Sequence, residues 1–141
     1  MDYHGIHNPK KARQLLLFED ISKDGIGMTD IDGLIEYKDK ALILFEIKHG
    51  NKEVPIGQRL VLERMVNNAA ATGKDAVAIV AEHSVEDPEL PVFVRLCRVR
   101  EIYWGSEKRW RKPHKELTAG EITDTIINMA KMKGVVSWRK A

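Results

Sequence analysis

Two apolar segments, residues 28–37 and 41–48, flank the polar tripeptide KDK, and this pattern constrains the fold more than any other. Both segments are rich in Ile, Leu, Tyr or Phe, which are common in β-strands. A short polar connection between two such segments predicts a β-hairpin. The length of the loop would then set the register of the two strands.

The segments around the hairpin predict helices. Asn8 and Pro9 are favourable residues at the start of a helix, so we expect one over residues 9–22. Pro55 opens a second predicted helix, whose apolar residues recur at three- and four-residue spacing and which should end near Gly73. The hairpin is therefore expected between two helices.

The second half of the chain continues the alternation. Residues 75–83 are predicted as a short buried strand, and residues 91–104 as a longer, partly exposed strand. Thr118 and Glu121 form a capping box ahead of a final helix. This order of elements predicts an α/β domain with a mixed sheet.

Length and composition limit the class of protein. A chain of 141 residues fits one domain, and we expect a single domain over residues 1–141. Cys97 is the only cysteine, which excludes an internal disulfide and a cysteine-based zinc cluster. No segment resembles a signal peptide or reaches the roughly 20 apolar residues of a membrane span. We therefore expect a cytoplasmic protein without membrane contact.

Charge is divided unevenly along the chain. Residues 1–91 carry 11 Lys and Arg against 16 Asp and Glu, whereas residues 92–141 carry 12 against 5. The segment KRWRKPHK, residues 108–115, is the most basic and includes Trp110. Its cations suit the phosphates of a nucleic acid, and the tryptophan either stacks on a base or anchors the loop. A solvent-exposed loop without a partner is the simpler alternative.

The hairpin brings acidic residues together. If all three residues of KDK form the loop, Asp32 lies directly across from Glu46, and Asp30 lies across from Lys48. Opposed residues have Cβ atoms about 4.5–5.5 Å apart, so the two carboxylates would be close. A two-residue turn would separate them.

Two adjacent carboxylates repel each other, and the pKa of one should rise unless a cation lies between them. Mg²⁺ is such a cation, because it takes oxygen ligands at about 2.0–2.1 Å and is often held by one or two carboxylates. Lys48, on the same face as Glu46, would flank a metal-bound water or a phosphate. A surface cluster of ion pairs on an ordinary α/β domain is the alternative, although exposed pairs stabilise little.

These residues carry a family resemblance. Asp32 followed by Glu46-Ile47-Lys48 resembles the D…(D/E)-x-K signature of the PD-(D/E)XK nuclease superfamily. The segment DIDGLIEYKDKALILFEIK, with Gln58 in the helix after it, is similar to archaeal-type Holliday-junction resolvases and their phage counterparts. The resemblance covers roughly residues 8–82. Ile31 stands where the signature has proline, which leaves Asp30 as a rival to Asp32.

The resemblance implies a restriction-endonuclease-like core, a mixed sheet with a central hairpin flanked by helices. It also implies Mg²⁺-dependent hydrolysis of DNA, with Mn²⁺ as a substitute. Asp32, Glu46 and the carbonyl of Ile47 would bind the metal, and Lys48 would position or deprotonate the attacking water.

Two further residues are candidates for the catalytic site through the resemblance. Many members of the superfamily add a glutamate from the first helix, which corresponds to Glu19. That residue falls either within the apolar stripe of the predicted helix or on its exposed side. Gln58 resembles a glutamine that some relatives place near the metal, and exposure to solvent is the alternative.

The expected partner is DNA, most specifically branched or junction DNA in recombination or repair. Because a four-way junction has local two-fold symmetry, a resolvase needs a symmetric homodimer. The candidate DNA-contacting residues are Lys10, Lys11, Arg13, His49, Lys52, Lys108, Arg109, Arg111 and Lys112. The alternatives are an exonuclease or a nicking or repair nuclease of the same superfamily, and a DNA-binding module that lacks catalysis. A bacterial, archaeal or phage-infected host cell is the expected source.

Overall fold

The computed structural model describes residues 28–140 together with residues 16, 21 and 24, and describes side chains as far as residue 133. The chain divides into two compact units, residues 1–30 and 31–141. Most of the helix predicted over residues 9–22 lies outside the described residues. At the two described positions within it the prediction is wrong, because Leu16 has no regular secondary structure and Ile21 lies in a turn.

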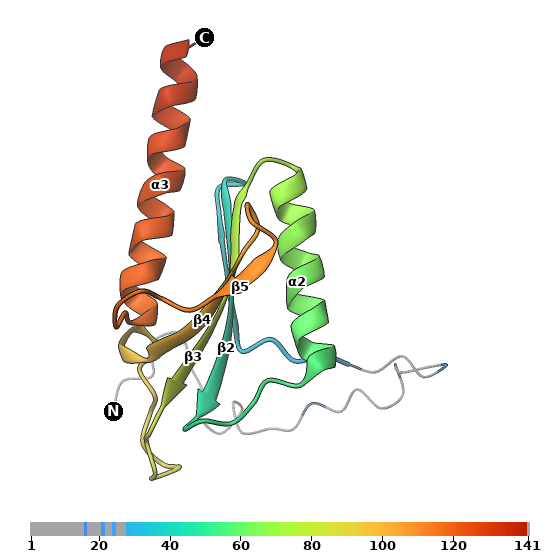
Figure 1. Cartoon of the computed structure of the whole chain (residues 1–141), viewed down its shortest axis with the longest axis vertical. Helices are drawn as coiled ribbons and strands as arrows, with labels where there is room; N and C mark the ends of the chain where they lie inside the picture. The colour runs from blue at the N-terminus through green and yellow to red at the C-terminus, as the bar shows by residue number, and fades with distance from the viewer. Residues whose placement is uncertain (1–15, 17–20, 22–23, 25–27, 141) are drawn as a thin grey trace. The chain divides into compact units, whose positions relative to one another are not determined.

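The second unit contains a five-stranded mixed sheet, two α-helices and one 3₁₀ turn (Figure 1). The elements are β1 (Gly33–Tyr37), β2 (Ala41–His49), α2 (Ile56–Ala71), β3 (Asp75–His83), η1 (Val94–Leu96), β4 (Arg98–Trp104), β5 (Arg109–Arg111) and α3 (Ala119–Lys140). The predicted α/β architecture with a mixed sheet is confirmed. No helix within the described part of the chain is long and apolar enough to cross a membrane.

The strands lie in their order along the chain, β1 to β5. Strands β2 and β3 are parallel, and the other neighbouring pairs are antiparallel. The expectation of a central hairpin is therefore wrong, because the hairpin of β1 and β2 forms one edge of the sheet. Helix α2 follows the hairpin and leads into β3, which pairs with β2 on the side away from β1. Strand β1 therefore has β2 as its one neighbour among the described strands.

The predicted three-residue loop of the hairpin is confirmed. Its register runs from Gly33 opposite Phe45 to Tyr37 opposite Ala41. The loop closes with the N–H of Lys40 donating to the carbonyl of Tyr37 over 2.7 Å. However, the ladder begins at residue 33 rather than 28, so the expected cross-strand pairs of residues 30 and 32 are not part of it.

Helices α2 and α3 cover opposite faces of the sheet (Figure 1). Successive side chains of β2 point to opposite faces of the sheet, so this strand contributes to the hydrophobic core on each face. Ile43 and Phe45 pack with Ile126 of α3, whereas Leu44 packs with Leu62 of α2. Side chains that follow Leu44 at two-residue intervals along β2 therefore face α2.

The helix boundaries follow the signals in the sequence. Pro55 lies at the N-cap of α2, and the helix ends before Gly73, whose φ of +90° suits glycine. Thr118 and Glu121 form the predicted capping box of α3, with reciprocal hydrogen bonds of 3.2 Å. Both predictions are confirmed.

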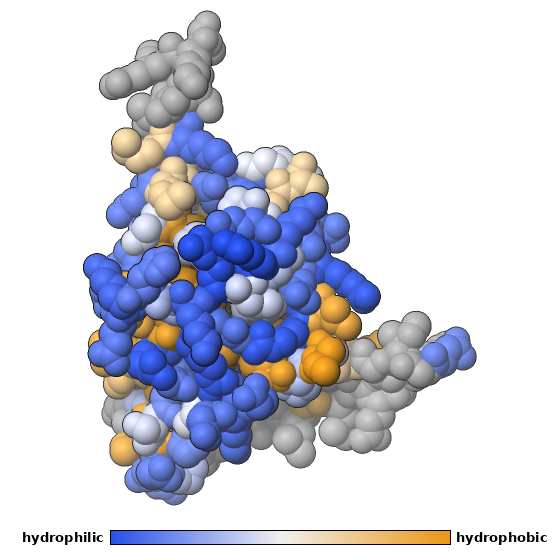
Figure 2. All heavy atoms as spheres, viewed as in Figure 1, coloured by the Kyte–Doolittle hydropathy of each residue, from blue (hydrophilic) through white to orange (hydrophobic). Residues whose placement is uncertain are grey.

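The strand predicted over residues 91–104 is only half correct, because β4 starts at Arg98. Pro91 lacks a backbone N–H, and the N–H groups of Leu96 and Cys97 bond locally to Phe93 and Val94 in the 3₁₀ turn. These backbone N–H groups are therefore not available to pair with a neighbouring strand. The basic segment, for which the sequence predicts no strand, contributes β5, and Figure 2 shows this side of the molecule as predominantly hydrophilic.

Candidate active site

Three elements bring a cluster of polar side chains together around Glu46. This residue is 3% exposed and is the one charged residue that is buried in the part of the chain the structure describes. Lys48 Nζ lies 3.2 Å from Glu46 Oε1, and Gln58 Nε2 donates to Glu46 Oε2 over 2.9 Å. The structure therefore brings together three of the candidate site residues, Glu46, Lys48 and Gln58.

The local sequence explains this arrangement. In β2, Glu46 and Lys48 follow Leu44 at two-residue intervals, so they occupy the face covered by α2. The connection of residues 50–55 then returns the chain so that the first turn of α2, which carries Gln58, lies over this end of the strand. Glu46 is consequently buried by the start of the helix.

Asp32 reaches the cluster in a way that strand pairing did not predict. It lies at a bend just before β1, and its Oδ2 accepts a hydrogen bond of 2.7 Å from the N–H of Ile47. In a continued ladder, residue 31 would be opposite Ile47. The carboxylate of Asp32 thus takes the place of a backbone partner, which ends the ladder and directs this acid to β2.

The two carboxylates interact electrostatically. Burial raises the pKa of Glu46 above its ordinary value, and the negative charge of Asp32 raises that pKa further. Lys48 and Gln58 lower it, but they do not offset the other two effects. The cluster therefore favours an added positive charge, which a bound cation would supply.

The donor set fits a hard divalent cation. Asp32 and Glu46 supply carboxylate oxygens, and the carbonyl of Ile47 points to the same side of β2 as its N–H, toward Asp32. No group of three or more His, Cys, Asp or Glu side chains in the described ranges could hold a metal. Two carboxylates and a carbonyl nevertheless suit Mg²⁺, which keeps several waters.

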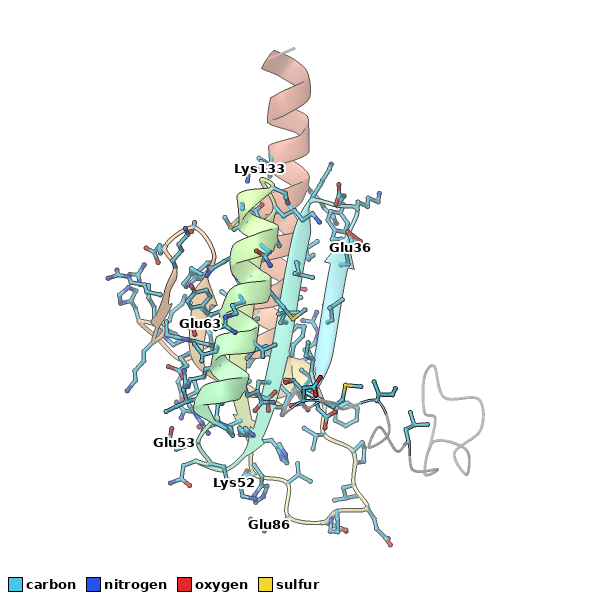
Figure 3. The ribbon with its side chains drawn as sticks, turned by 90° about the vertical axis from the view of Figure 1, so that its right-hand side faces the viewer. Glu36, Lys52, Glu53, Glu63, Glu86 and Lys133 are labelled. Carbon is cyan, nitrogen blue, oxygen red and sulfur yellow. The ribbon has the colours of Figure 1, made fainter. Side chains whose placement is uncertain are left out.

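Two predicted DNA-contacting residues lie where β2 ends. The Nε2 atom of His49 is 3.7 Å from Glu86 Oε1, and its ring is 5.1 Å from that of His83. Lys52 is exposed in the connection before α2 (Figure 3). Both residues lie within four positions of Lys48 in the chain.

The basic residues of β5 are placed differently. Arg109 and Arg111 pair with Trp104 and Ile102, and these alternate positions belong to the face of α3. They extend from the edge of the sheet opposite β1, so the structure does not bring them to Glu46. Lys108 lies in the turn before β5, and Lys112 is exposed just after it.

Trp110 anchors β5 against α2. Its Nε1 donates to Glu63 over 3.2 Å, and its ring lies 5.3 Å from that of Tyr103. The guanidinium of Arg59 lies 4.8 Å from the centre of the indole ring. Of the two interpretations of this tryptophan, the structure supports the anchor.

Several predicted site residues are not placed with the cluster. Lys10, Lys11, Arg13 and Glu19 lie outside the described residues. Asp30 is described, at the end of the first unit, and it precedes the ladder in which we expected it to face Lys48.

The charged residues of β4 were not among the site residues that the sequence predicts. Arg100 is bonded to Glu82 and to the connection before α2, and Glu101 is paired with Arg59. A signal for them was present in the sequence, because RVREIYW is a strand-like segment that nevertheless contains charged residues.

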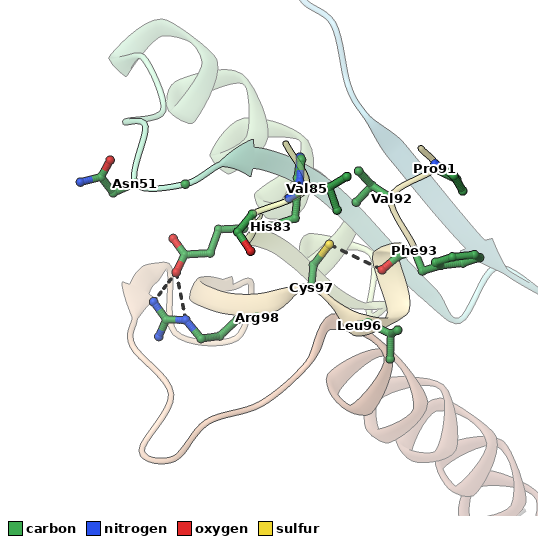
Figure 4. Close-up of a pocket in the computed structure, with 12 residues that line it drawn as sticks. Asn51, His83, Val85, Pro91, Val92, Phe93, Leu96, Cys97 and Arg98 are labelled. Carbon is green, nitrogen blue, oxygen red and sulfur yellow. Dashed lines mark hydrogen bonds and ion pairs between the residues drawn. The ribbon is translucent and has the colours of Figure 1, made fainter. Parts of the chain in front are cut away.

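A separate pocket of about 640 Å³ lies beside the connection between β3 and β4 (Figure 4). Its lining is mainly apolar and includes Val85, Val92, Phe93 and Leu96. None of the residues clustered around Glu46 lines it. The candidate active site is therefore distinct from this pocket.

Comparisons of the chain with family models, with curated proteins and with solved structures found no match.

Proposed function

We propose that the chain is a Mg²⁺-dependent endodeoxyribonuclease of the PD-(D/E)XK type. The observation that carries this proposal is the burial of Glu46 beside Asp32 and Lys48. This arrangement costs stability, because burial and the charge of Asp32 disfavour the charged form of Glu46, and such a cost is typical of functional sites.

In this proposal Asp32, Glu46 and the Ile47 carbonyl would hold Mg²⁺, or Mn²⁺ in its place. The ion would supply a Lewis acid and a more acidic bound water. Gln58 fixes the carboxylate of Glu46 through the bond of 2.9 Å. Lys48, whose side chain is 21% exposed, can both orient the attacking water and stabilise negative charge that develops on the phosphate.

The proposed substrate is branched DNA, and the proposed fold is the restriction-endonuclease-like core. A mixed sheet between two helices supports that fold. The excess of Lys and Arg in residues 92–141 supports a polyanionic partner. Cutting both strands of a junction symmetrically would require a homodimer, which would act in recombination or repair in the cytoplasm.

Cleavage of supercoiled plasmid and of a synthetic four-way junction tests the proposal. The wild-type protein should cut with Mg²⁺ and should not cut in EDTA. E46Q should lower kcat by at least about 10³-fold, because it removes a charged ligand, while DNA binding persists. E116Q, at an exposed residue, is the matched control and should cut normally. Wild-type rates in E46Q would refute the proposal.

A DNA-binding module without catalysis is the second candidate. The position of Arg109 and Arg111 on the face opposite the cluster favours it, because DNA bound there need not reach Glu46. DNA binding without cleavage by the wild-type protein under any of these conditions would favour this candidate.

A further inference from the structure

A β-bulge in β4 directs two consecutive side chains, those of Arg100 and Glu101, toward residues 50–59. Val80 is opposite Glu101 and Ala81 is opposite Val99, so Arg100 is the extra residue. In a regular strand, Arg100 and Glu101 would point to opposite faces. A bulge redirects a side chain, and here both residues contact the segment that leads into and starts α2.

Arg100 holds the connection between β2 and α2. Its Nη1 donates to the carbonyl of Lys52 over 2.6 Å, and its Nη2 donates to the carbonyl of Gly50 over 2.8 Å. Glu82 fixes the guanidinium from β3, with Nε 3.2 Å from Oε2. The side chains of Arg100 and Glu82 are each only 18% exposed, so solvent competes weakly for these bonds.

Glu101 holds the first turn of α2 through an ion pair with Arg59. The side chains of these two residues are 15% and 23% exposed. Helix α2 has no side-chain hydrogen bond at its N-cap, Pro55, so the contacts of Arg100 and Glu101 are tertiary contacts to a helix start that has no side-chain cap. Arg59 directly follows Gln58, whose amide bonds to Glu46.

We propose that Arg100 and Glu101 are positioning residues, which hold residues 50–59 so that Gln58 stays bonded to Glu46 beside Lys48. The effect on catalysis rests on the proposed nuclease function. The effect on the backbone of residues 50–59 does not. A small displacement of groups around a metal ligand slows the chemical step without weakening substrate binding.

A purely structural role has a different signature. It would lower the free energy of unfolding but leave kcat unchanged in the protein that remains folded. Positioning predicts a loss in kcat at constant DNA affinity, together with local opening of the connection. The two roles are therefore separable in one set of variants.

The test compares R100M and R100K with R98M. Arg98 is a matched control because it also bonds to Glu82, and its described hydrogen bonds go to Glu82 rather than to the connection. Amide hydrogen exchange of residues 50–59 in the full chain is the first measurement. The second is kcat and KM for the proposed DNA substrate, well below the unfolding temperature.

R100M should speed exchange in residues 50–59 about tenfold and lower kcat about 10- to 100-fold, with KM unchanged. R100K should recover part of both losses, because an ammonium can still donate to a carbonyl. R98M should match wild type in both measurements. E101Q, which weakens the pair with Arg59, should speed exchange in the first turn of α2 and remains informative if R100M does not fold.

Unchanged exchange in R100M and E101Q would overturn the inference. Faster exchange with wild-type kcat would also overturn it, since the contacts would then be structural only. If the wild-type protein does not cut DNA, the proposed function fails. The exchange measurement then decides by itself whether the bulge holds Gln58 in place.

Discussion

At the scale of the residue, Glu46 combines burial with a like charge nearby. Both effects raise its pKa, so the folded protein binds this proton more tightly than the unfolded chain does. The contribution of Glu46 to stability is therefore fully present below the ordinary pKa of 4.5 and is lost as pH rises through the raised value. Above that value, the buried charge lowers the free energy of unfolding.

The first prediction concerns this pH dependence. E46Q removes the titration, so its free energy of unfolding should rise relative to wild type as pH increases from about 4.5, and the difference should level off above the raised pKa. Urea unfolding of both proteins between pH 4 and pH 8 measures it. E116Q should show no such trend, and a pH-independent difference for E46Q would contradict the electrostatic account.

The second prediction separates the effect of Asp32 from that of burial. In D32N the amide oxygen can still accept the hydrogen bond from Ile47, but the negative charge is gone. The pKa of Glu46 should therefore fall relative to wild type, because the repulsion by Asp32 is one of the two causes that raise it and only burial remains. Carboxyl ¹³C NMR titration of Glu46 measures this, and an unchanged pKa would show that the two acids are not coupled.

At the scale of the element, the end of α2 gives the third prediction. Gly73 has φ +90° and Gly57 has no such backbone, while a Cβ would have open space at both positions. G73A should lower the free energy of unfolding by about 1 kcal/mol, because alanine disfavours positive φ. G57A is the matched control at the other end of α2, inside its first turn, and should raise the free energy of unfolding by about 0.5–1 kcal/mol. Thermal or urea unfolding decides, and equal signs would contradict the backbone argument.

Elements also show what could be predicted from the sequence. The hairpin register followed from loop length, and the ends of α2 and α3 followed from Pro55, Gly73 and the capping box, because these signals are local. The bend at Asp32 and the bulge at Arg100 depend on tertiary partners, namely the N–H of Ile47 and the carbonyls of the connection. Short-range patterns do not encode such partners. The sequence therefore predicted the acids of the site, but not the bend at Asp32 or the bulge at Arg100.

At the scale of the molecule, the site is assembled from three different kinds of local structure. Asp32, Glu46 and Gln58 come from a bend, a strand and a helix, and each is held by a different contact. Only the folded unit creates this concentration of negative charge. A cation that binds the cluster should therefore bind the native state and stabilise it.

This linkage gives the fourth prediction. If Mg²⁺ binds with a Kd of about 1 mM, 10 mM Mg²⁺ should raise the free energy of unfolding by about 1.4 kcal/mol. The gain should disappear in E46Q and persist in E116Q, and Na⁺ at equal ionic strength should not reproduce it. Urea unfolding with and without Mg²⁺ measures the effect in the absence of DNA, so it tests the metal site separately from catalysis. An equal gain in E46Q and wild type would place the bound ion elsewhere, because Glu46 supplies half of the carboxylates proposed to hold it.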